Sequence, residues 1–473
     1  MFECVNCSSK EESGRLDAKC SRFGSALLLF NPDIGSVRRS EIDALPPGVW
    51  RFRMLLPEIS NGQVVTLGEG GTPLLPAKRL GDELGFENLL IKDETMNPTG
   101  SFLDRGSTVL VSLARERGVK RFSCTTTGNL GASLAAYAAK AGIETEIGIH
   151  PNTDRGKLYQ MIAYGAKVEI FSRASERDHS EPSSLSVSAG NPFILEGEKT
   201  TGFEIIHDLN WSQPDAIVLP VGTGGHLTMV WRSLLQLNQA ALMEEPSCRL
   251  IGVQLQASAP IVADLQTRKR PRVAQERLTE LEESEPTFKK VAVSSIKDSK
   301  GHGIEVSASE AIRGTSLLAR TEGIFAEPAA ASVVASLRRA KEEGLLRSGD
   351  RIVCVITGTG LKDTKIVTRM ARMPKHLVGT EDFDVQPFEI GMTKLRMMEA
   401  LSEGPAFGYG LWRALSKEKG ITTASVYQHL SELERAALVR RSRVVKFRGR
   451  ERIFYELTRK GSELLKALRK TMG

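Results

Sequence analysis

Residues 92–106 read Lys-Asp-Glu-Thr-Met-Asn-Pro-Thr-Gly-Ser-Phe-Leu-Asp-Arg-Gly. The apolar run Leu89-Leu90-Ile91 before them predicts a strand, and the pattern from Ser107 to Arg117 after them predicts a helix. In an α/β protein, a polar segment between a strand and a helix belongs to the edge of the sheet where ligands bind. We therefore expect this segment to line a ligand-binding cleft.

The same alternation of strand and helix continues to about residue 375. Further helical patterns occur at Ala132–Ala141 and Leu227–Leu237. Further strand-like runs are Phe122–Thr125, Glu144–Ile149, Ala216–Leu219, Leu250–Leu255 and Ile352–Ile356. This alternation is typical of parallel sheets covered by helices, and it predicts an α/β body of two lobes with a cleft between them. The Ser-rich stretch Ser172–Gly190 and the charged stretch Thr267–Lys290 are expected to be exposed loops.

Length and composition set wide bounds on the chain. With 473 residues, 41% of them apolar, it is expected to fold into two or three domains. It shows no signal peptide and no apolar run near about 20 residues, which predicts a soluble, cytoplasmic protein without a membrane partner. Six scattered cysteines suit a reducing compartment. We expect an N-terminal region at 1–60, the body at 61–375, a linker at 376–387 and a C-terminal domain at 388–473.

The N-terminal region contains Cys4-x2-Cys7 followed by Cys20, which resembles half of a zinc ribbon. The position where a second pair of cysteines would close the site is Phe23. Three thiolates without a fourth ligand make a poor structural zinc site. A ribbon that folds without a metal is therefore the favoured expectation, and the three cysteines remain weak candidates for metal binding.

Stretches at four places resemble the motifs of threonine synthases, in the same order along the chain. They are Gly68–Leu74 with residues 92–106, then Thr126–Ser133, Gly222–His226 and Thr357–Asp363. Glu327-Pro328-Ala329 also fits the pattern. Threonine synthases depend on pyridoxal phosphate, so the resemblance implies the fold type II architecture of pyridoxal-phosphate enzymes for the body.

The resemblance also implies roles for individual residues. The residues implied for the cofactor or another ligand are Asn129, Gly222, Thr223, Gly224, Gly225, His226 and Thr357, with His226 standing where asparagine is more usual. Those implied for a substrate anion are Ser101, Arg105, Thr126, Thr127, Gly128 and Lys157. Consecutive glycines and the dipole of a following helix do favour an anion, although a strand-to-helix turn that binds nothing has the same pattern.

Three features depart from the family pattern. In threonine synthases the position of Leu103 is occupied by the lysine that holds the cofactor as an imine, and leucine has no amine. The acidic stretch Thr279–Glu285 precedes Pro286, where a small apolar segment is usual. The incomplete ribbon is the third departure. We therefore expect a retained fold with no catalytic residue.

A surrogate amine would have to come from another lysine. Lys92 and Lys157 lie in segments of the expected cleft, but neither is at the attachment position. Imine chemistry requires the amine to be placed within about 1 Å, so rescue by these lysines is not the expected outcome.

Positive charge is concentrated at the C-terminal end. Residues 388–473 carry 18 Lys and Arg against 9 Asp and Glu, a net charge of +9, and the rest of the chain carries −2. This predicts an anionic partner, although a solubilising charged face would give the same balance. The periodicity predicts helices at Lys394–Leu401, Tyr409–Lys417 and Ser425–Ala436, a β-hairpin at Arg441–Leu457 and a terminal helix at Thr458–Met472.

This segment resembles the winged helix-turn-helix domain of PadR-type regulators at Lys394–Leu401, Gly404–Leu411, Ser425–Leu433 and Phe454–Gly461. In such a domain the second helix enters the major groove and the hairpin meets phosphates or a minor groove. The candidate DNA-binding residues are Thr423, Ser425, Tyr427, Gln428, Arg441, Arg443, Lys446, Arg448, Arg450 and Arg452. A winged helix used for protein contact is the alternative. Regulators of this type dimerise, so a homodimer on paired half-sites of double-stranded DNA is expected.

The two halves together predict a ligand-responsive, DNA-binding transcriptional regulator built on a catalytically inactive threonine synthase-like scaffold. Its ligand would be a small anionic metabolite: an amino acid, a phosphorylated amino acid such as O-phosphohomoserine, or pyridoxal phosphate held without a covalent bond. The alternative is an active threonine synthase, or a related pyridoxal-phosphate-dependent lyase, with a regulatory DNA-binding appendage. A purely structural partner protein has the least support, because the anion-binding loops are largely preserved.

Overall fold

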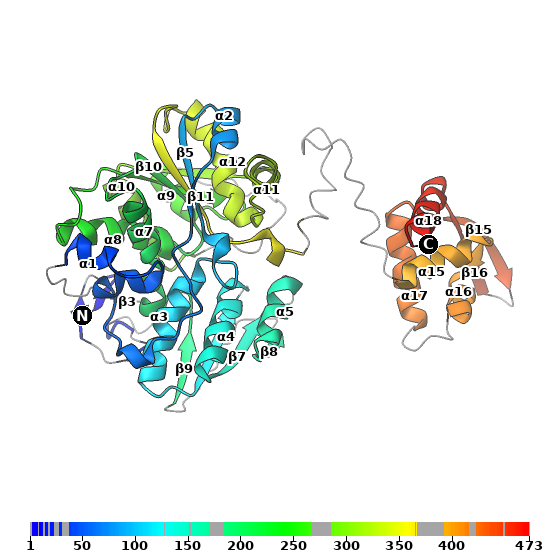
Figure 1. The fold of residues 1–473 in the computed structure, drawn as a ribbon. Coiled ribbons are helices and arrows are strands. Elements are labelled where there is room, and N and C mark those ends of the chain that lie inside the picture. Colours follow the sequence, from blue (N-terminus) through cyan, green and yellow to red (C-terminus); the bar gives the residue numbers. More distant parts are fainter. Residues whose placement is uncertain are drawn as a thin grey trace. The chain divides into compact units, whose positions relative to one another are not determined.

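Figure 1 shows the computed structural model of the chain. It describes residues 2–7, 9–12, 15–17, 19–22, 28–30, 37–126, 128–150, 153–170, 183–266, 285–364, 366, 392–415, 422–447 and 450–472. The chain divides into two units, Met1–Met370 and Ala371–Gly473, which we call the body and the C-terminal unit. None of the helices in these ranges combines the length and the apolar character needed to cross a bilayer.

The larger sheet of the body has six strands in the order β12-β11-β10-β13-β5-β4. They are β4 (Leu74–Pro76), β5 (Asn88–Asp93), β10 (Ala216–Pro220), β11 (Arg249–Leu255), β12 (His302–Val306) and β13 (Arg351–Ile356). All neighbours pair in parallel except the edge strand β4, which is antiparallel to β5. Every residue of β10 is buried, as expected for a central parallel strand with both faces covered.

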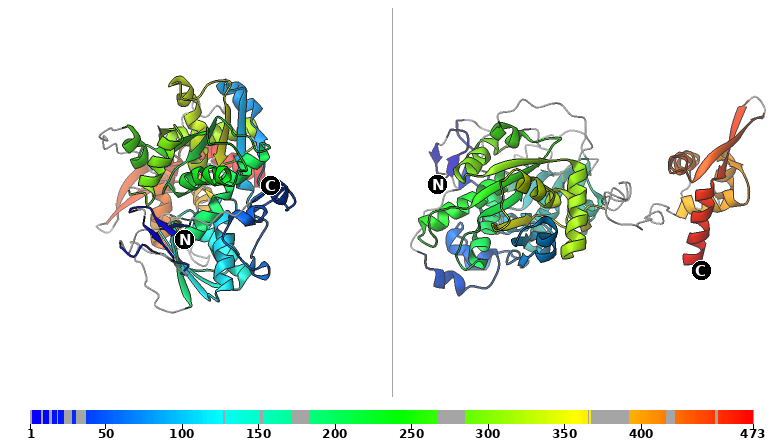
Figure 2. Two further views of the ribbon diagram at one scale, coloured as in Figure 1. Left: turned by 90° about the vertical axis from the view of Figure 1, so that its left-hand side faces the viewer. Right: turned by 90° about the horizontal axis from the view of Figure 1, so that it is seen from above.

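Helices cover both faces of this sheet (Figures 1 and 2). One face packs against α2 (Lys78–Leu84), α11 (Ala308–Glu322) and α12 (Pro328–Glu342). The other packs against α7 (Thr200–Asp208), α8 (Gly225–Gln239), α9 (Pro260–Gln266) and α10 (Lys289–Asp298).

The smaller lobe is built on a parallel sheet in the order β8-β7-β6-β9. Its strands are β6 (Arg121–Thr126), β7 (Glu144–Ile149), β8 (Lys167–Ile170) and β9 (Ser184–Val187). Its helices are α3 (Leu103–Glu116), α4 (Asn129–Ala141), α5 (Arg155–Ala163) and α6 (Pro192–Glu198). The predicted two-lobed α/β body with parallel sheets is confirmed.

Two local predictions were wrong within the described residues. The stretch Ser172–Gly190 was expected to be a loop, yet Ser184–Val187 forms β9, in which Leu185 and Val187 are buried against the lobe. Its two-residue alternation is hidden among serines. Thr267–Lys290 was expected to be exposed, but Phe288 is buried; residues 267–284, including most of the acidic stretch, lie outside the described residues. So does the expected linker 376–387.

The N-terminal region begins with a small antiparallel sheet of β1 (Phe2–Cys4), β2 (Lys10–Glu11) and β3 (Leu28–Phe30), followed by α1 (Arg39–Asp43). Phe2 and Cys4 belong to the same apolar cluster as the helices of the smaller lobe. The small sheet is therefore packed into the body.

The C-terminal unit consists of α15 (Met392–Ser402), β14 (Ala406–Phe407), α16 (Gly408–Leu415), α17 (Thr423–Arg435), β15 (Val439–Phe447), β16 (Arg450–Leu457) and α18 (Arg459–Met472). The three strands pair antiparallel in the order β14-β16-β15. Val426, Leu430 and Leu433 of α17 are buried, as predicted, in one core with α15, α16 and β15. This arrangement of helices and hairpin agrees with the predicted winged-helix domain.

Candidate functional site

The loops that follow β5 and β13 meet, as expected for the C-terminal ends of neighbouring parallel strands. The backbone N–H of Thr359 donates to the carbonyl of Gly100 at 3.0 Å. The loop after β10 joins them, because the ring of His226 stacks on Phe102 with centroids 4.2 Å apart. These loops, together with the N-terminal ends of α4 and α12, form what we call the cleft.

Leu103 is the first residue of α3, at the wall of this cleft. The predicted helix begins here rather than at Ser107. The side chain of Leu103 is 8% exposed and lies in one apolar cluster with Leu130 and Ile194. The position is therefore filled by a hydrocarbon side chain that can pack but cannot form an imine.

Four polar side chains form a network in the cleft. Asn129, at the start of α4, donates through Nδ2 to Glu327 Oε1 at 2.9 Å, and accepts at Oδ1 from Lys362 Nζ at 3.0 Å. Lys157 Nζ lies 3.1 Å from Glu327 Oε2. Gly128 makes this possible: its φ is +146°, and a Cβ there would collide with the Lys157 side chain. We call Asn129, Glu327, Lys157 and Lys362 the cleft network.

The glycine loop Gly222–Gly225 enters α8 in a conformation that suits an anion. Gly224 caps the helix with φ of 88°. Thr223 fixes the loop by accepting at its carbonyl from the N–H of Phe288, at 3.0 Å. The N–H groups of Gly222, Thr223 and Gly224 have no hydrogen-bond acceptor among the described residues. Free N–H groups at the N-terminus of a long helix attract negative charge.

Two buried polar atoms beside this loop lack partners. His226 Nε2 lies 3.1 Å from Thr201 Oγ1, but its Nδ1 has no partner among the described residues, and neither has Ser101 Oγ. Burial lowers the pKa of His226 to about 3, so its ring is neutral at physiological pH. Unsatisfied buried polar groups are rare in folded proteins, and a polar ligand would satisfy these two.

Arg105 is not placed as a ligand-binding cation. Its side chain is completely buried, and all three guanidinium nitrogens donate to Glu94, Glu204, Thr72 or Thr200. Burial alone would raise the pKa of Glu204, but the charge of Arg105 outweighs it and holds that pKa far below its usual range. The arginine therefore joins α3 to α7 and to the loop after β5, and its predicted contact with a substrate anion has no support in this geometry.

The remaining predicted residues of the body divide into two groups. Thr357 is buried at the end of β13, beside Phe102, in the cleft. Thr126 Oγ1 accepts from the N–H of Gly128 at 3.1 Å, and so stabilises the turn into α4. Thr127 lies outside the described residues. Lys92 is ion-paired with Glu204 and Asp208, both at 2.9 Å, which removes it as a surrogate amine.

Lys362 was missed by sequence reasoning. It lies in the 3-10 turn Gly360–Lys362, which follows β13. The available signal was the glycine pattern Gly358-Thr359-Gly360, which follows a buried strand just as the loop of α8 does. A lysine two residues beyond such a loop can reach the same edge of the sheet.

The three cysteines of the N-terminal region come together, as the half-ribbon pattern suggested. The Sγ atoms of Cys4, Cys7 and Cys20 all lie within 4.8 Å of one another. A hydrogen bond with Ser9 lowers the pKa of the Cys7 thiol to about 7. Phe23 lies outside the described residues. The cluster offers three sulfur ligands, and whether it holds a metal stays a prediction.

The second helix of the winged-helix unit, α17, presents part of its predicted contact face to solvent. Tyr427 and Gln428 are exposed, and the Gln428 amide donates to Glu432 at 3.1 Å. Ser425 is less available, because its hydroxyl donates to the carbonyl of Thr422 while its N–H donates to the Thr422 hydroxyl. Thr423 follows this cap and is half-buried.

The hairpin carries the predicted cations in different settings. Arg441 is ion-paired with Glu434 at 3.0 Å. Arg443 lies over the ring of Phe454, 4.8 Å from its centroid, and Arg452 lies over Phe407 at 4.7 Å. The side chains of Lys446 and Arg450, and all of Arg448, lie outside the described residues. Two arginines are therefore held by aromatic rings, with their charges not consumed by those contacts.

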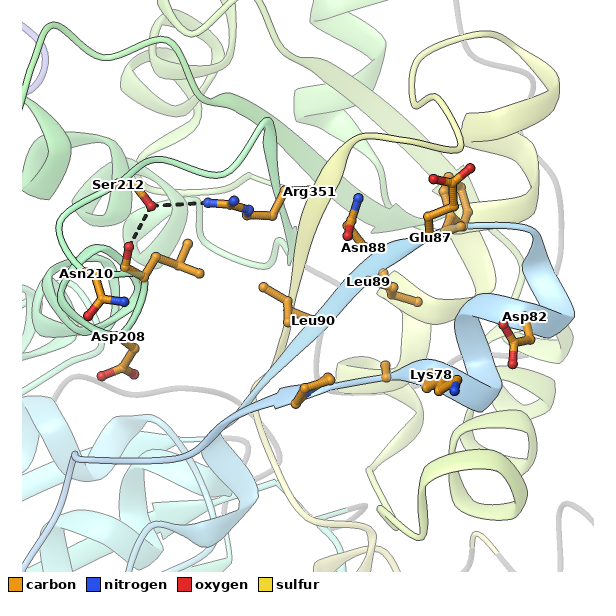
Figure 3. A pocket seen from close by; sticks show the side chains of 14 residues that line it. Lys78, Asp82, Glu87, Asn88, Leu89, Leu90, Asp208, Asn210, Ser212 and Arg351 are labelled. Carbon is orange, nitrogen blue, oxygen red and sulfur yellow. Dashed lines mark hydrogen bonds between the residues drawn. The ribbon is translucent and has the colours of Figure 1, made fainter.

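A pocket of ≈ 880 Å³ lies elsewhere on the body (Figure 3). It is lined by residues that begin β5 and β13, including Asn88 and Arg351, whose guanidinium donates to Ser212 at 3.1 Å. These are the N-terminal ends of the strands. The pocket is therefore separate from the cleft, and its mixed Lys, Asp and Glu lining shows no convergent set of polar groups for one ligand.

Comparisons with known proteins match two parts of the chain. Residues 65–358 match the pyridoxal-phosphate dependent enzyme family, and residues 397–467 match the PadR-like family of transcriptional regulators. Threonine synthase from Methanocaldococcus jannaschii is 34% identical over 386 residues, covering 78% of this chain and 95% of that protein. Threonine synthase from Mycobacterium tuberculosis is 36% identical over 327 residues, covering 67% and 89%. Threonine deaminase isoform 2 from Solanum lycopersicum has a similar fold, with a TM-score of 0.53 at 20% identity, covering 71% and 96%.

Proposed function

The chain belongs to the family of pyridoxal-phosphate dependent enzymes and carries a PadR-like domain, and from this premise we propose that it is a ligand-responsive DNA-binding transcriptional regulator with a catalytically inactive body. The observation that carries the proposal is Leu103. We assign it to the position of the family's lysine on the motif around it, and its side chain is buried among apolar residues. Without an amine there, the body loses both the imine and the base that moves protons on the substrate.

The cleft fits part of pyridoxal phosphate. The free N–H groups of the glycine loop suit its phosphate, and Asn129 and Thr357 supply polar groups nearby. Ser101 Oγ and His226 Nδ1 could satisfy further polar atoms of a ligand. When bound in an enzyme, this cofactor supplies an electron sink for carbanions. Here Leu103 provides no covalent hold, so binding would rest on the loop and on hydrogen bonds.

We infer that the ligand is a small anion. Lys157 and Lys362 both point their amines into the cleft network, where Glu327 pairs with only one of them at 3.1 Å. An amino acid, a phosphorylated amino acid or pyridoxal phosphate would each bring the missing negative charge. Such a ligand would shift the body between conformations and so alter the DNA affinity of the attached unit.

The proposed partner of the C-terminal unit is double-stranded DNA. Its winged-helix arrangement, the exposed Tyr427 and Gln428, and the arginines of the hairpin support this proposal. PadR-like regulators act as dimers, so paired half-sites are proposed as well. The direct test is titration of the full-length protein with promoter fragments at low salt, with and without candidate metabolites. Absence of DNA binding under these conditions would refute the regulator.

Substitutions in the C-terminal unit should separate two kinds of DNA contact. Arg443→Ala is expected to weaken binding of all sequences alike and to reduce the slope of log affinity against log salt by about 1, because one phosphate contact is lost. Gln428→Ala is expected to cost about 1–3 kcal/mol on the preferred site only, because a base contact is lost. Fluorescence anisotropy over a salt series measures both.

The matched control is Arg459→Ala. Arg459 is exposed like Arg443, but it begins α18 and pairs with Glu463 at 2.9 Å. It should leave affinity and salt slope unchanged. Equal losses in the three variants would show that total charge, rather than a docked hairpin and helix, governs binding.

The alternative function is an active threonine synthase-like lyase with a regulatory appendage. One observation favours keeping it: Lys362 brings an amine into the cleft that the motif comparison did not foresee. Turnover of O-phosphohomoserine to threonine and phosphate by the purified protein would establish that alternative and would remove the inactive scaffold.

A further inference from the structure

Lys362 differs from the other buried lysines of the described body. Those with almost no exposed surface are Lys92, Lys157, Lys199 and Lys362. The first three form ion pairs, with Glu204, Glu327 and Glu196 respectively. Lys362 has no described carboxylate within ion-pair distance, and its Nζ donates only to the neutral Oδ1 of Asn129, at 3.0 Å. Its amine is therefore buried without a counter-ion.

This environment favours the neutral amine. Burial, together with the neighbouring charge of Lys157, lowers the pKa of Lys362 to about 8, although Asp104 and Glu327 act in the opposite direction. At neutral pH the neutral fraction is then about two orders of magnitude larger than for an ordinary lysine. Lysines that are desolvated beside a second cation are the ones that react as nucleophiles.

The amine also lies beside the segment that ends in Leu103. A Cβ built on Gly100 would lie 3.5 Å from Lys362 Cε. The charge of Lys362 acts on Asp104, the residue after Leu103. Its hydrogen-bond partner Asn129 begins α4, on the opposite wall. Lys362 thus enters the cleft between the loop after β5 and the N-terminus of α4.

We propose that Lys362 is the amine with which this protein holds an aldehyde ligand that carries a phosphate, in place of the amine missing at residue 103. The proposal rests on the proposed function, in which the cleft binds a small anion. The neutral Nζ adds to the aldehyde carbon, a carbon–nitrogen double bond forms, and the carbonyl oxygen leaves with two protons from the amine as water. No oxidant or reductant is needed, and the family's own aldehyde, pyridoxal phosphate, is the natural probe.

The decisive measurement is a map of the bond. Full-length protein is mixed with pyridoxal phosphate, reduced with borohydride, digested and analysed by mass spectrometry. The expected result is a single pyridoxyl adduct on the peptide that contains Lys362. Lys92 and Lys199 serve as internal controls, because they are equally buried but ion-paired. Trapping should rise between pH 7 and pH 9, as the amine loses its proton around a pKa of about 8.

Lys362→Arg keeps the charge and removes the nucleophile, and Lys362→Gln keeps a hydrogen-bond donor to Asn129. Both should abolish trapping, while quenching of intrinsic fluorescence by pyridoxal phosphate persists. An adduct on Lys157, or scattered over exposed lysines, would overturn the proposal. Quenching without any adduct would also overturn it and leave the proposed sensor intact. The proposed function fails by a different result, the absence of DNA binding.

Discussion

Arg105→Met is expected to destabilise the body by about 3–5 kcal/mol, because it leaves two buried carboxylates without their cation. The Arg105 guanidinium lies 2.6 Å from Glu94 and 2.7 Å from Glu204. In the native protein, burial opposes ionisation of Glu94 but the Arg105 charge outweighs it, so the pKa lies below its usual range. The network is therefore intact at neutral pH and is lost only as pH falls below the ordinary carboxyl range. Urea unfolding of the body, followed by tryptophan fluorescence, measures the loss.

Arg121→Met is the matched control for this change. Arg121 pairs with Glu144 at 3.3 Å, but at the surface, where such a pair contributes at most about 1 kcal/mol. The triple variant Arg105→Met, Glu94→Gln and Glu204→Gln should recover part of the lost stability, because it removes the stranded charges together. A variant Arg105→Met that remained stable but lost its ligand would contradict us and restore the arginine to the anion site.

The contrast between Arg105 and the glycine loop explains how far the sequence alone could be read. The loop Gly222–Gly225 was predicted because strand, glycines and helix follow one another within a few residues, and each signal is local. The partner that occupies Arg105 is Glu204, 99 positions away. A motif can place a residue at the correct edge of the sheet, but which groups occupy its hydrogen bonds depends on packing between distant segments.

The same limit applies to the cleft network. Lys362 meets Asn129 across 233 positions, and Asn129 meets Glu327 across 198. Nothing in the local pattern around these residues indicates that they converge. The winged-helix unit shows the opposite case, because the apolar spacing of Val426, Leu430 and Leu433 within one helix predicted their burial correctly. Local periodicity therefore predicted elements and faces, and missed the long-range polar contacts on which the chemistry depends.

Leu103→Lys is expected to convert the cleft into one that binds pyridoxal phosphate covalently at residue 103. The position is the first of α3, and its side chain is 8% exposed, next to the loop that carries Ser101. A lysine there has a hydrocarbon stem that can replace leucine in the apolar cluster. Its amine would be poorly solvated and so would favour the neutral, nucleophilic form. Borohydride reduction and peptide mapping should place the adduct on residue 103.

The double variant Leu103→Lys, Lys362→Arg separates this amine from the native one, and Leu103→Met fills a similar volume without any amine. The double variant should trap the cofactor, whereas the methionine variant should behave as the natural protein does. If Leu103→Lys folded and bound DNA yet formed no adduct at residue 103, that residue would not face the ligand, and the loss of a lysine could not explain an inactive body. If the adduct forms, the cleft has kept the geometry of an enzyme while its native covalent chemistry depends on Lys362 alone.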